Sequence, residues 1–397
     1  MLEDVKPKRR DWQLHRILVS AALSRGQLLL PSIALTLFVV TGCRAPANQL
    51  YPLGIYSVAQ TNLALVRQAG FNLVVGSAEK GYLDAAVSNG LQVLASPGTS
   101  AGRGFSAEHA RSAVRAFDSH PGLWGWYVVD EPDLLRLPPR EVRQANQFLK
   151  NLGARKPTAL ALYQGYNAID YGNIADVTMI DRYPIPWLPL ANFAQHVRQV
   201  RLVLGRGKPL IAVVQAMSWE AYPELMPGES NLRAPTYEEL RCMTYCALVE
   251  GATGLFYYCF GDDRWKILDH PEVWQGVQRV VAEVNERLPL FQAEHLFWPY
   301  LQEFDDPSLR FNEALEASIR AVLLRVRIGN GSLAAGNYIL AVNTTSHSNR
   351  SKFSLPTSAR GAVQVVGEKR LLILERGWIE DEFGPYAVHL YGPLPAD

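Results

Sequence analysis

One pattern repeats along most of this chain: a short apolar stretch that fits a strand, followed by a longer amphipathic stretch that fits a helix. The expected strands cover residues 53–57, 71–76, 91–96, 123–130, 159–163, 177–181, 210–215 and 254–259. The expected helices cover residues 60–69, 79–89, 106–118, 138–152, 190–204, 236–250 and 271–288. Only the connection around 166–174 is too short to predict a helix. The strands are continuous apolar runs, as in sheets whose two faces are both buried.

The spacing between these strands fixes how they pair. Parallel strands need crossovers of a dozen or more residues, and the spacing here allows crossover helices but not hairpins. Eight such units are the count expected for a (β/α)₈ barrel, or TIM barrel, and we assign residues 51–292 to it. A doubly wound open sheet is the alternative, but no Gly-rich phosphate loop follows the first strand. The sequence therefore predicts an α/β protein built on a barrel.

After Leu288 the helical pattern ends. Short stretches of alternating polarity follow at residues 318–328, 338–343, 362–368, 371–374 and 386–391. Gly, Asn and Ser separate them, for example at Gly329-Asn330-Gly331, as is typical of antiparallel sheets. We place the boundary near 290–298 and predict a small all-β sandwich over residues 293–397. The acidic run Glu380-Asp381-Glu382, followed by Phe383-Gly384-Pro385, is interpreted as a turn between two strands.

The N-terminus has the organisation of an export signal. Residues 1–27 are basic, and residues 28–40 form an apolar run of a length that suits a signal peptide but is too short to span a bilayer. Val40-Thr41-Gly42-Cys43 resembles the bacterial lipobox, in which the cysteine is lipidated and becomes the new N-terminus. We predict a signal peptide over residues 1–42, lipidation at Cys43 and a tether over 43–50. The expected location is the cell envelope, at the outer membrane in a Gram-negative cell, with the lipid as the only membrane anchor.

Composition excludes several classes of protein. The 39 Lys and Arg against 38 Asp and Glu give a net charge of +1, which offers no electrostatic basis for binding nucleic acid. Four cysteines are too few for a disulfide scaffold. With Cys43 lipidated, we interpret Cys242, Cys246 and Cys259 as buried free thiols. The His residues show no metal-binding spacing, so we predict neither a metal nor a cofactor.

In a barrel of this kind, chemistry takes place at the carboxyl ends of the strands. Asp130 and Glu131 end the fourth strand, and Asp181 and Tyr183 share one face at the end of the sixth. Further candidate substrate-binding residues at strand ends or in the loops after them are Tyr56, Gln215, Trp219, Glu220, Tyr257, Asp262 and Trp265. Carboxylates that transfer protons and flat rings that stack on sugars are the groups needed for glycoside cleavage.

One of these segments also resembles a known group of enzymes. The stretch Trp124-Gly125-Trp126-Tyr127-Val128-Val129-Asp130-Glu131-Pro132 is similar to the fourth-strand motif of clan A glycoside hydrolases, the group of family 5 and family 42 type barrels. The segment 235–258 resembles the helix and eighth strand of bacterial proteins of this type. The resemblance implies that Glu131 is the general acid/base and that Asp130 contacts the sugar.

The sequence departs from that group on the seventh strand. Retaining clan A enzymes carry a Glu nucleophile there, whereas this chain has Gln215. Asp181 is our first candidate for the second carboxylate, with Glu220 and Asp262 as alternatives; a fourth possibility is that no second carboxylate exists.

Two other acids have structural explanations. Thr236 and Glu239 fit a capping box, and Glu250 ends the same helix as a partner for a nearby base.

Three functions fit these observations. The first is an exported glycoside hydrolase that acts on a poly- or oligosaccharide. The second is a non-catalytic carbohydrate-binding lipoprotein on a degenerate glycosidase barrel, an alternative raised by Gln215. The third, a structural envelope protein without a ligand, leaves the carboxylates at the strand ends unexplained.

Overall fold

The computed structural model describes residues 50–98, 105–304, 318–355 and 360–395. The predicted signal peptide, Cys43 and the tether up to residue 49 lie outside the described residues. The barrel and the strands that follow it belong to one compact unit that begins at Pro46. Among the helices in the described part of the chain, none combines the length and the apolar character needed to cross a membrane.

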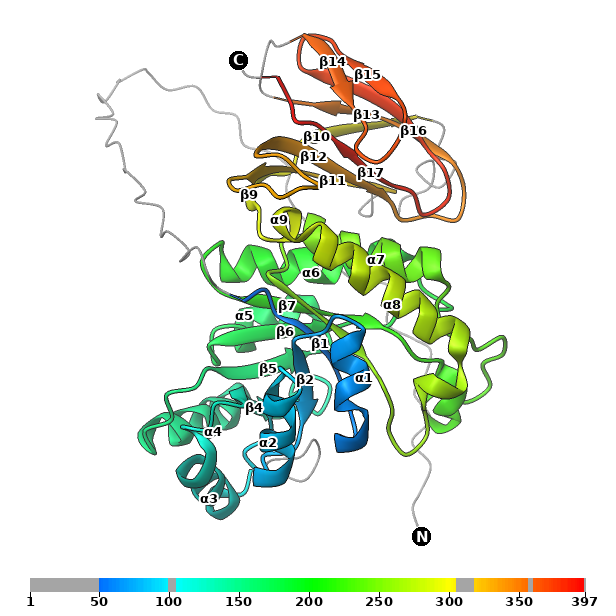
Figure 1. Ribbon diagram of the computed structural model, residues 1–397. Helices are drawn as coiled ribbons and strands as arrows, with labels where there is room; N and C mark the ends of the chain where they lie inside the picture. Colours follow the sequence, from blue (N-terminus) through cyan, green and yellow to red (C-terminus); the bar gives the residue numbers. More distant parts are fainter. Residues whose placement is uncertain (1–49, 99–104, 305–317, 356–359, 396–397) are drawn as a thin grey trace, which may run out of the picture. The chain divides into compact units, whose positions relative to one another are not determined.

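Eight parallel strands close into a barrel, which confirms the predicted fold (Figure 1). The strands are β1 (Leu53–Ile55), β2 (Leu73–Gly76), β3 (Gln92–Ala95), β4 (Leu123–Val129), β5 (Thr158–Leu162), β6 (Val177–Asp181), β7 (Leu210–Gln215) and β8 (Gly254–Tyr258). Each neighbours the next along the chain, and β8 pairs with β1. Every boundary lies within two residues of its prediction.

Helices cover the outside of the strands. They are α1 (Leu63–Gln68), α2 (Lys80–Ser88), α3 (Ala107–Phe117), α4 (Pro139–Asn151), α6 (Leu190–Leu204), α7 (Tyr237–Val249), α8 (Pro271–Glu286) and the short α9 (Leu288–Phe291). The short fifth connection forms only η2 (Gly165–Asn167) and α5 (Ala168–Tyr171). At the start of α7 the Glu239 carboxylate accepts a hydrogen bond from the Thr236 backbone N–H, and the Thr236 hydroxyl accepts one from Glu239. The predicted capping box is therefore confirmed.

Two antiparallel sheets follow the barrel and form the predicted sandwich. One sheet has the order β17-β12-β11-β9, the other has the order β10-β13-β16, and β14 and β15 form a separate pair. The strands are β9 (Glu294–Phe297), β10 (Tyr300–Phe304), β11 (Ile319–Val326), β12 (Gly336–Asn343), β13 (Asn349–Ser354), β14 (Gly361–Gln364), β15 (Leu371–Leu374), β16 (Trp378–Phe383) and β17 (Val388–Tyr391). The helical part ends at Phe291, and the antiparallel part begins at Glu294.

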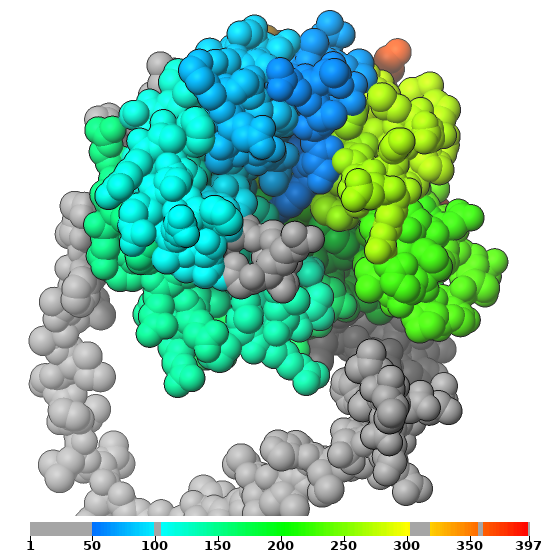
Figure 2. Space-filling view, turned by 90° about the horizontal axis from the view of Figure 1, so that it is seen from below, coloured from blue at the N-terminus to red at the C-terminus, as the bar shows by residue number. Residues whose placement is uncertain are grey.

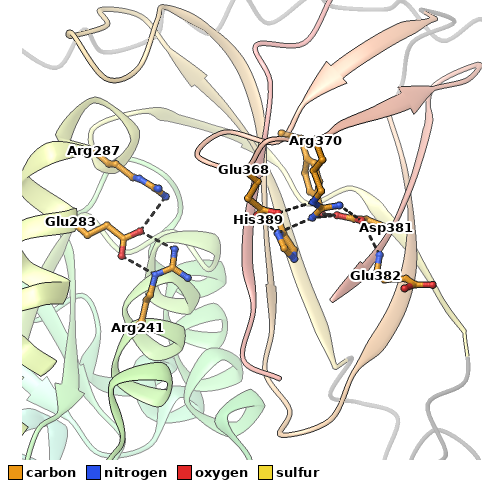
Figure 3. Close-up of polar contacts among 9 residues, drawn as sticks. Arg241, Glu283, Arg287, Glu368, Arg370, Asp381, Glu382 and His389 are labelled. Carbon is orange, nitrogen blue, oxygen red and sulfur yellow. Dashed lines mark hydrogen bonds and ion pairs between the residues drawn. The ribbon is translucent and has the colours of Figure 1, made fainter. Parts of the chain in front are cut away.

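The prediction of a turn at Glu380-Asp381-Glu382 is wrong, because these residues lie inside β16. Asp381 is buried, and its carboxylate accepts hydrogen bonds from the Arg370 guanidinium at 2.5 and 2.8 Å (Figure 3). It also accepts one from the Tyr391 hydroxyl at 2.8 Å. An acidic residue therefore faces the interior of the sandwich, whereas its polar character had suggested an exposed turn. The strands β9, β10, β13 and β16 all lie outside the predicted stretches, and β13 is largely polar.

The sandwich packs against the barrel through α7, which contacts β11 and β12. Glu250 follows α7 and is completely buried. Its carboxylate accepts hydrogen bonds from Arg198 at 2.5 Å and from Arg320 of β11 at 3.4 Å. The Trp298 indole also donates to the Val249 carbonyl at 2.9 Å. Glu250 thus has the basic partners that were predicted, and one of them belongs to the sandwich.

A second group of charges lies on the neighbouring helices. Arg241 of α7 donates to both carboxylate oxygens of Glu283 of α8 at 2.8 Å, and Arg287 lies 3.2 Å from the same carboxylate (Figure 3). Burial raises the pKa of Glu283, but the arginines outweigh it and hold the pKa below its usual value. Cys242, Cys246 and Cys259 are buried free thiols, as predicted.

Candidate active site at the carboxyl ends of the barrel strands

The carboxyl ends of the strands surround a recess. Figure 2 shows this face, with the loops after the strands in blue, cyan, green and yellow-green around a central hollow. On one side of it lies a cavity of about 470 Å³. Ser57, Ser77 and Ser96 from the ends of β1, β2 and β3 line this cavity together with Tyr127 and Asp262. These groups can donate and accept the hydrogen bonds that a polar ligand would require.

Glu131 follows β4 directly and has a strained backbone. Its φ of +41° lies in the left-handed region, which residues with a side chain rarely adopt. Such strain persists only where the surrounding structure enforces it, and it is common at functional sites. Burial, followed by the negative charges of Asp130 and Asp133, raises the pKa of Glu131 to about 8. Glu131 is therefore able to keep its proton at neutral pH.

Asp130 is connected to a chain of tyrosine hydroxyls inside the barrel. The Tyr56 hydroxyl donates to the Tyr127 hydroxyl at 3.2 Å, and Tyr127 donates to the Asp130 carboxylate. Burial raises the pKa of Asp130, although the bond from Tyr127 opposes this effect. Tyr56 and Tyr127 are themselves buried, with pKa values above the usual range because of burial and the nearby carboxylates.

Asp181 ends β6 and interacts electrostatically with Asp130 and Glu131 at the end of β4. Its side chain is buried, and its Oδ1 has no hydrogen-bond partner. Burial, followed by the charges of Glu131, Asp130 and Asp133, raises its pKa well above the usual value. The structure thus brings Asp130, Glu131 and Asp181 into one electrostatic cluster, as the strand-end positions predicted.

Asp133 holds the loop after β4 in place. Its carboxylate accepts hydrogen bonds from the backbone N–H groups of Tyr163 and Gln164 at 3.1 and 2.8 Å, and from the Asn167 amide at 3.0 Å. These bonds connect the loop that carries Glu131 to the segment after β5. Asp133 therefore fixes the position of the loop that carries Glu131, and its negative charge contributes to the raised pKa of Glu131.

Aromatic rings line the remaining part of the mouth. Tyr183 stacks on Tyr258 with ring centroids 5.3 Å apart and an interplanar angle of 23°. Tyr258 also meets Tyr56 edge-on at 5.5 Å, and Trp219 lies 6.2 Å from Tyr183. Trp187 lies 6.1 Å from Trp219. The predicted rings Tyr56, Tyr183 and Trp219 are therefore brought together.

The predicted role of Gln215 in holding substrate is wrong. The side chain is completely buried, and both ends of its amide are engaged. Its Nε2 donates to the carbonyls of Ile185 and Met217 at 3.0 and 3.2 Å, and its Oε1 accepts from the Ile185 N–H at 2.9 Å. Gln215 fastens the loop after β6 to the end of β7, which is a task for an amide and not for a carboxylate nucleophile.

Two predicted sugar platforms lie elsewhere. Tyr257 is completely buried on the outer face of β8, where its hydroxyl lies 2.9 Å from the Thr244 hydroxyl of α7. Side chains alternate along a strand, so Tyr258 and not Tyr257 points into the barrel. Trp265 is 2% exposed and stacks on His270 at 4.0 Å, so its ring is covered.

Neither alternative to Asp181 joins the cluster. Glu220 is exposed in the short helix η3 (Trp219–Ala221). Asp262 organises the loop after β8: it accepts hydrogen bonds from the Tyr222 hydroxyl at 2.6 Å and from the N–H groups of Arg264 and Trp265 at 2.8 Å. Burial raises the pKa of Asp262, but these bonds prevail and lower it. Asp262 is therefore a structural carboxylate.

Sequence reasoning missed Tyr127, Tyr258, Asp133 and Trp187 as members of this region. The alternation of side chains could have separated Tyr258 from Tyr257, because only one of two consecutive strand residues faces the barrel interior. Phe256 and Tyr258 both meet the Tyr56 ring, with centroids 5.9 and 5.5 Å away, so they share one face of β8. For Tyr127 the alternation is interrupted, because the pairing of β4 with β5 shifts between Tyr127 and Val129.

The site offers acid–base chemistry without an evident metal centre. Within the described residues, no group of three or more His, Cys, Asp or Glu side chains is arranged to hold a metal ion.

Comparison with known proteins gives similarity in structure but not in sequence. No family profile matches the chain, and no curated protein matches it by sequence. A family 5 glycoside hydrolase from Bacteroides vulgatus shares 12% identity, with a TM-score of 0.54 over 86% of this chain and 88% of that one. A catalytic mutant of a family 42 β-galactosidase from G. stearothermophilus shares 8% identity, with a TM-score of 0.54 over 86% of this chain and 98% of that one. The chain therefore has the fold of clan A glycoside hydrolases, as its fourth-strand motif predicted.

Proposed function

We propose that the barrel hydrolyses O-glycosidic bonds of a poly- or oligosaccharide, with Glu131 as the general acid and Asp181 as the second carboxylate. One observation carries this proposal: two carboxylates from β4 and β6 share an electrostatic cluster among aromatic rings at the end of the barrel where chemistry is expected. The family 5 and family 42 structures with the same fold support it.

The cluster suits acid–base catalysis because its members raise each other's pKa values. Loss of one proton leaves a negative charge that holds the remaining proton more tightly. Because burial and like charges raise the pKa values of both Glu131 and Asp181, the pair keeps a proton at a higher pH than isolated carboxyl groups do, which suits a general acid. Glu131 donates it to the departing oxygen, and Asp181 acts as base or nucleophile. Tyr183 and Trp219 provide flat surfaces for sugar rings.

A second candidate function is carbohydrate binding without catalysis. Gln215 favours it, because the inward position at the end of β7 holds an amide that is fully engaged with the loop after β6. In this case the aromatic rings and serines would hold a glycan that is never cleaved.

Hydrolysis by two matched variants separates these functions. We expect Glu131→Gln to lose at least about 100-fold of kcat/KM on a natural glycan, since general acid catalysis contributes typically about 10²–10⁴-fold. The loss on 4-nitrophenyl glycosides should be smaller, because that leaving group needs little protonation. Asp181→Asn should lose activity on both kinds of substrate. The control Glu286→Gln, exposed on α8, should change neither. Full activity of Glu131→Gln would refute its role, and glycan binding without any release would establish the second function.

We also propose that the protein is exported and anchored by a lipid at Cys43. The apolar run 28–40 followed by Val40-Thr41-Gly42-Cys43 supports this location. In cells, Cys43→Ser should abolish labelling with a palmitate analogue, whereas Cys242→Ser should leave it unchanged. Labelling that persists in Cys43→Ser would contradict the proposal.

A further inference from the structure

The carboxylate cluster contains one acid more than a two-carboxylate hydrolysis uses. If Glu131 and Asp181 carry the chemistry, Asp130 remains without a catalytic task. Within the described part of the chain, no arginine, lysine or histidine is among the groups that shift the pKa values of the three carboxylates, and the Oδ1 of Asp181 has no hydrogen-bond partner. The hydrogen-bond partner of Asp130 is the neutral Tyr127 hydroxyl, so a negative charge on Asp130 has no opposite charge to offset the cost of its burial.

Two arginines near the mouth in the described part of the chain are engaged elsewhere. Arg182 follows Asp181 in sequence, but its guanidinium donates to the Asn192 amide at 2.9 Å and lies 4.7 Å above the Tyr163 ring. Arg264 pairs with Glu224. Neither arginine is among the groups that shift the pKa values of the three acids; those shifts come from burial, like charges, the bond from Tyr127 to Asp130 and a backbone hydrogen bond at Asp181.

Aromatic rings surround the same space. Tyr56, Tyr127, Tyr183 and Tyr258 form a continuous group, with Tyr56–Tyr127 centroids 6.2 Å apart and Tyr56–Tyr258 centroids 5.5 Å apart. Ring faces attract organic cations, and the attraction grows where water is excluded. Carboxylates combined with aromatic rings therefore match a ligand that carries both a sugar ring and an ammonium group better than they match a hydrated metal ion.

We infer that the substrate is a glycan that contains amino sugars with free, protonated amines, and that Asp130 is the residue that binds the ammonium group. This inference rests on the proposed function, which makes the ligand a glycan, and adds that the glycan carries a positively charged amine. Binding would bring the missing cation to the cluster and would leave Glu131 and Asp181 for the reaction.

The test compares sugars that differ only in the amine. Binding of glucosamine, galactosamine and mannosamine is measured by calorimetry or NMR titration against glucose, galactose and mannose at pH 7. We expect at least one amino sugar to bind about tenfold or more tightly than its parent, equivalent to about 1.4 kcal/mol. Asp130→Asn should abolish this preference. Asp170→Asn, an exposed carboxylate on α5, should preserve it. Absence of an amine preference in all three pairs, including absence of binding, overturns the inference.

Further variants keep the test decisive if Asp130→Asn fails to fold. Asp130→Glu keeps the charge and should keep the preference, whereas Tyr183→Leu removes a ring and should weaken it. Arg103 belongs to the connection between β3 and α3 and lies outside the described residues. Arg103→Gln is therefore measured in parallel, as a check for a positive charge that already compensates the carboxylates. The amine preference should be present in wild type, and a preference that appears only in Arg103→Gln would overturn the inference.

The test of amine binding can fail or succeed independently of the test of hydrolysis. A preference for amines without release of any sugar would support the inference and refute catalysis. Glu131-dependent hydrolysis of neutral glycans without amine preference would refute the inference alone.

Discussion

The barrel mouth and the contact between barrel and sandwich both contain carboxylates that are largely removed from water, and the two groups are treated differently. Glu283 has two arginines and the Tyr245 hydroxyl around it, and Glu250 has Arg198 and Arg320. Glu131 and Asp181 have only like charges as neighbours. The acids between barrel and sandwich are therefore stabilised by basic partners. The acids of the mouth lack such partners and have raised pKa values, which is typical of functional sites.

The electrostatic consequences have opposite signs in the two regions. At Glu283 the arginines outweigh burial and lower the pKa, so the ionised form is favoured in the folded protein. At Glu131 burial and like charges raise the pKa to about 8, so the protonated form is favoured. Glu250 is intermediate: burial raises its pKa in spite of its two arginines, because no part of it reaches water.

The largest expected effect comes from breaking a compensated pair. Glu283→Gln leaves Arg241 and Arg287 without their carboxylate, and we expect the free energy of unfolding to fall by about 3 kcal/mol, in the range measured for broken buried pairs. Chemical denaturation at pH 7 measures this loss. The exposed Glu286→Gln on the same helix should stay within about 0.5 kcal/mol of wild type. Equal effects of the two variants would show that the pair has no special structural weight.

The mouth should respond in the opposite direction. Asp181→Asn removes a buried group whose ionised form is disfavoured by burial and by the charges of Glu131, Asp130 and Asp133, although a backbone hydrogen bond opposes them. The raised pKa of Asp181 means that its contribution to stability is lost as the pH rises, so we expect the variant to gain stability relative to wild type with increasing pH. The same denaturation experiment, repeated at several pH values, measures the gain. A variant that is less stable than wild type would mean that Asp181 has a structural partner.

The dependence of stability on pH sharpens the contrast. The folded pKa of Glu131 is raised from the usual 4.5 to about 8, so its contribution is fully present below about pH 4.5 and is lost as the pH rises through 8. Wild type should therefore lose stability relative to Glu131→Gln between pH 4.5 and 8, by at least about 1 kcal/mol. Glu283 has a lowered pKa, so its contribution is present at neutral pH and is lost on acidification. A constant difference between wild type and Glu131→Gln would contradict this assignment.

The sequence predicts the barrel well because each β/α unit is local and its strands are apolar on both faces. It also locates Asp130, Glu131 and Asp181, since the carboxyl ends of parallel strands meet at one end of a barrel. The sequence does not show which of two neighbouring strand residues points into the barrel. Tyr257 was expected to contact the sugar, but it faces outward and Tyr258 faces inward. The sequence fails again at Gln215, whose partners Ile185 and Met217 depend on the path of a loop. The burial of Asp381 could not be predicted, because its arginine partner, Arg370, comes from another segment of the sandwich.

Direct titration of the Glu131 carboxyl tests the central claim, that the acids of the mouth are uncompensated and hold a proton near neutral pH. Carbon-13 NMR of protein labelled at the glutamate side-chain carboxyl, with Glu131→Gln to assign the resonance, follows this one group. We expect a midpoint near pH 8, well above the usual 4.5. A midpoint near 4.5 would show that a positive charge or solvent compensates Glu131, and it would contradict both the acid role and the contrast between the two regions.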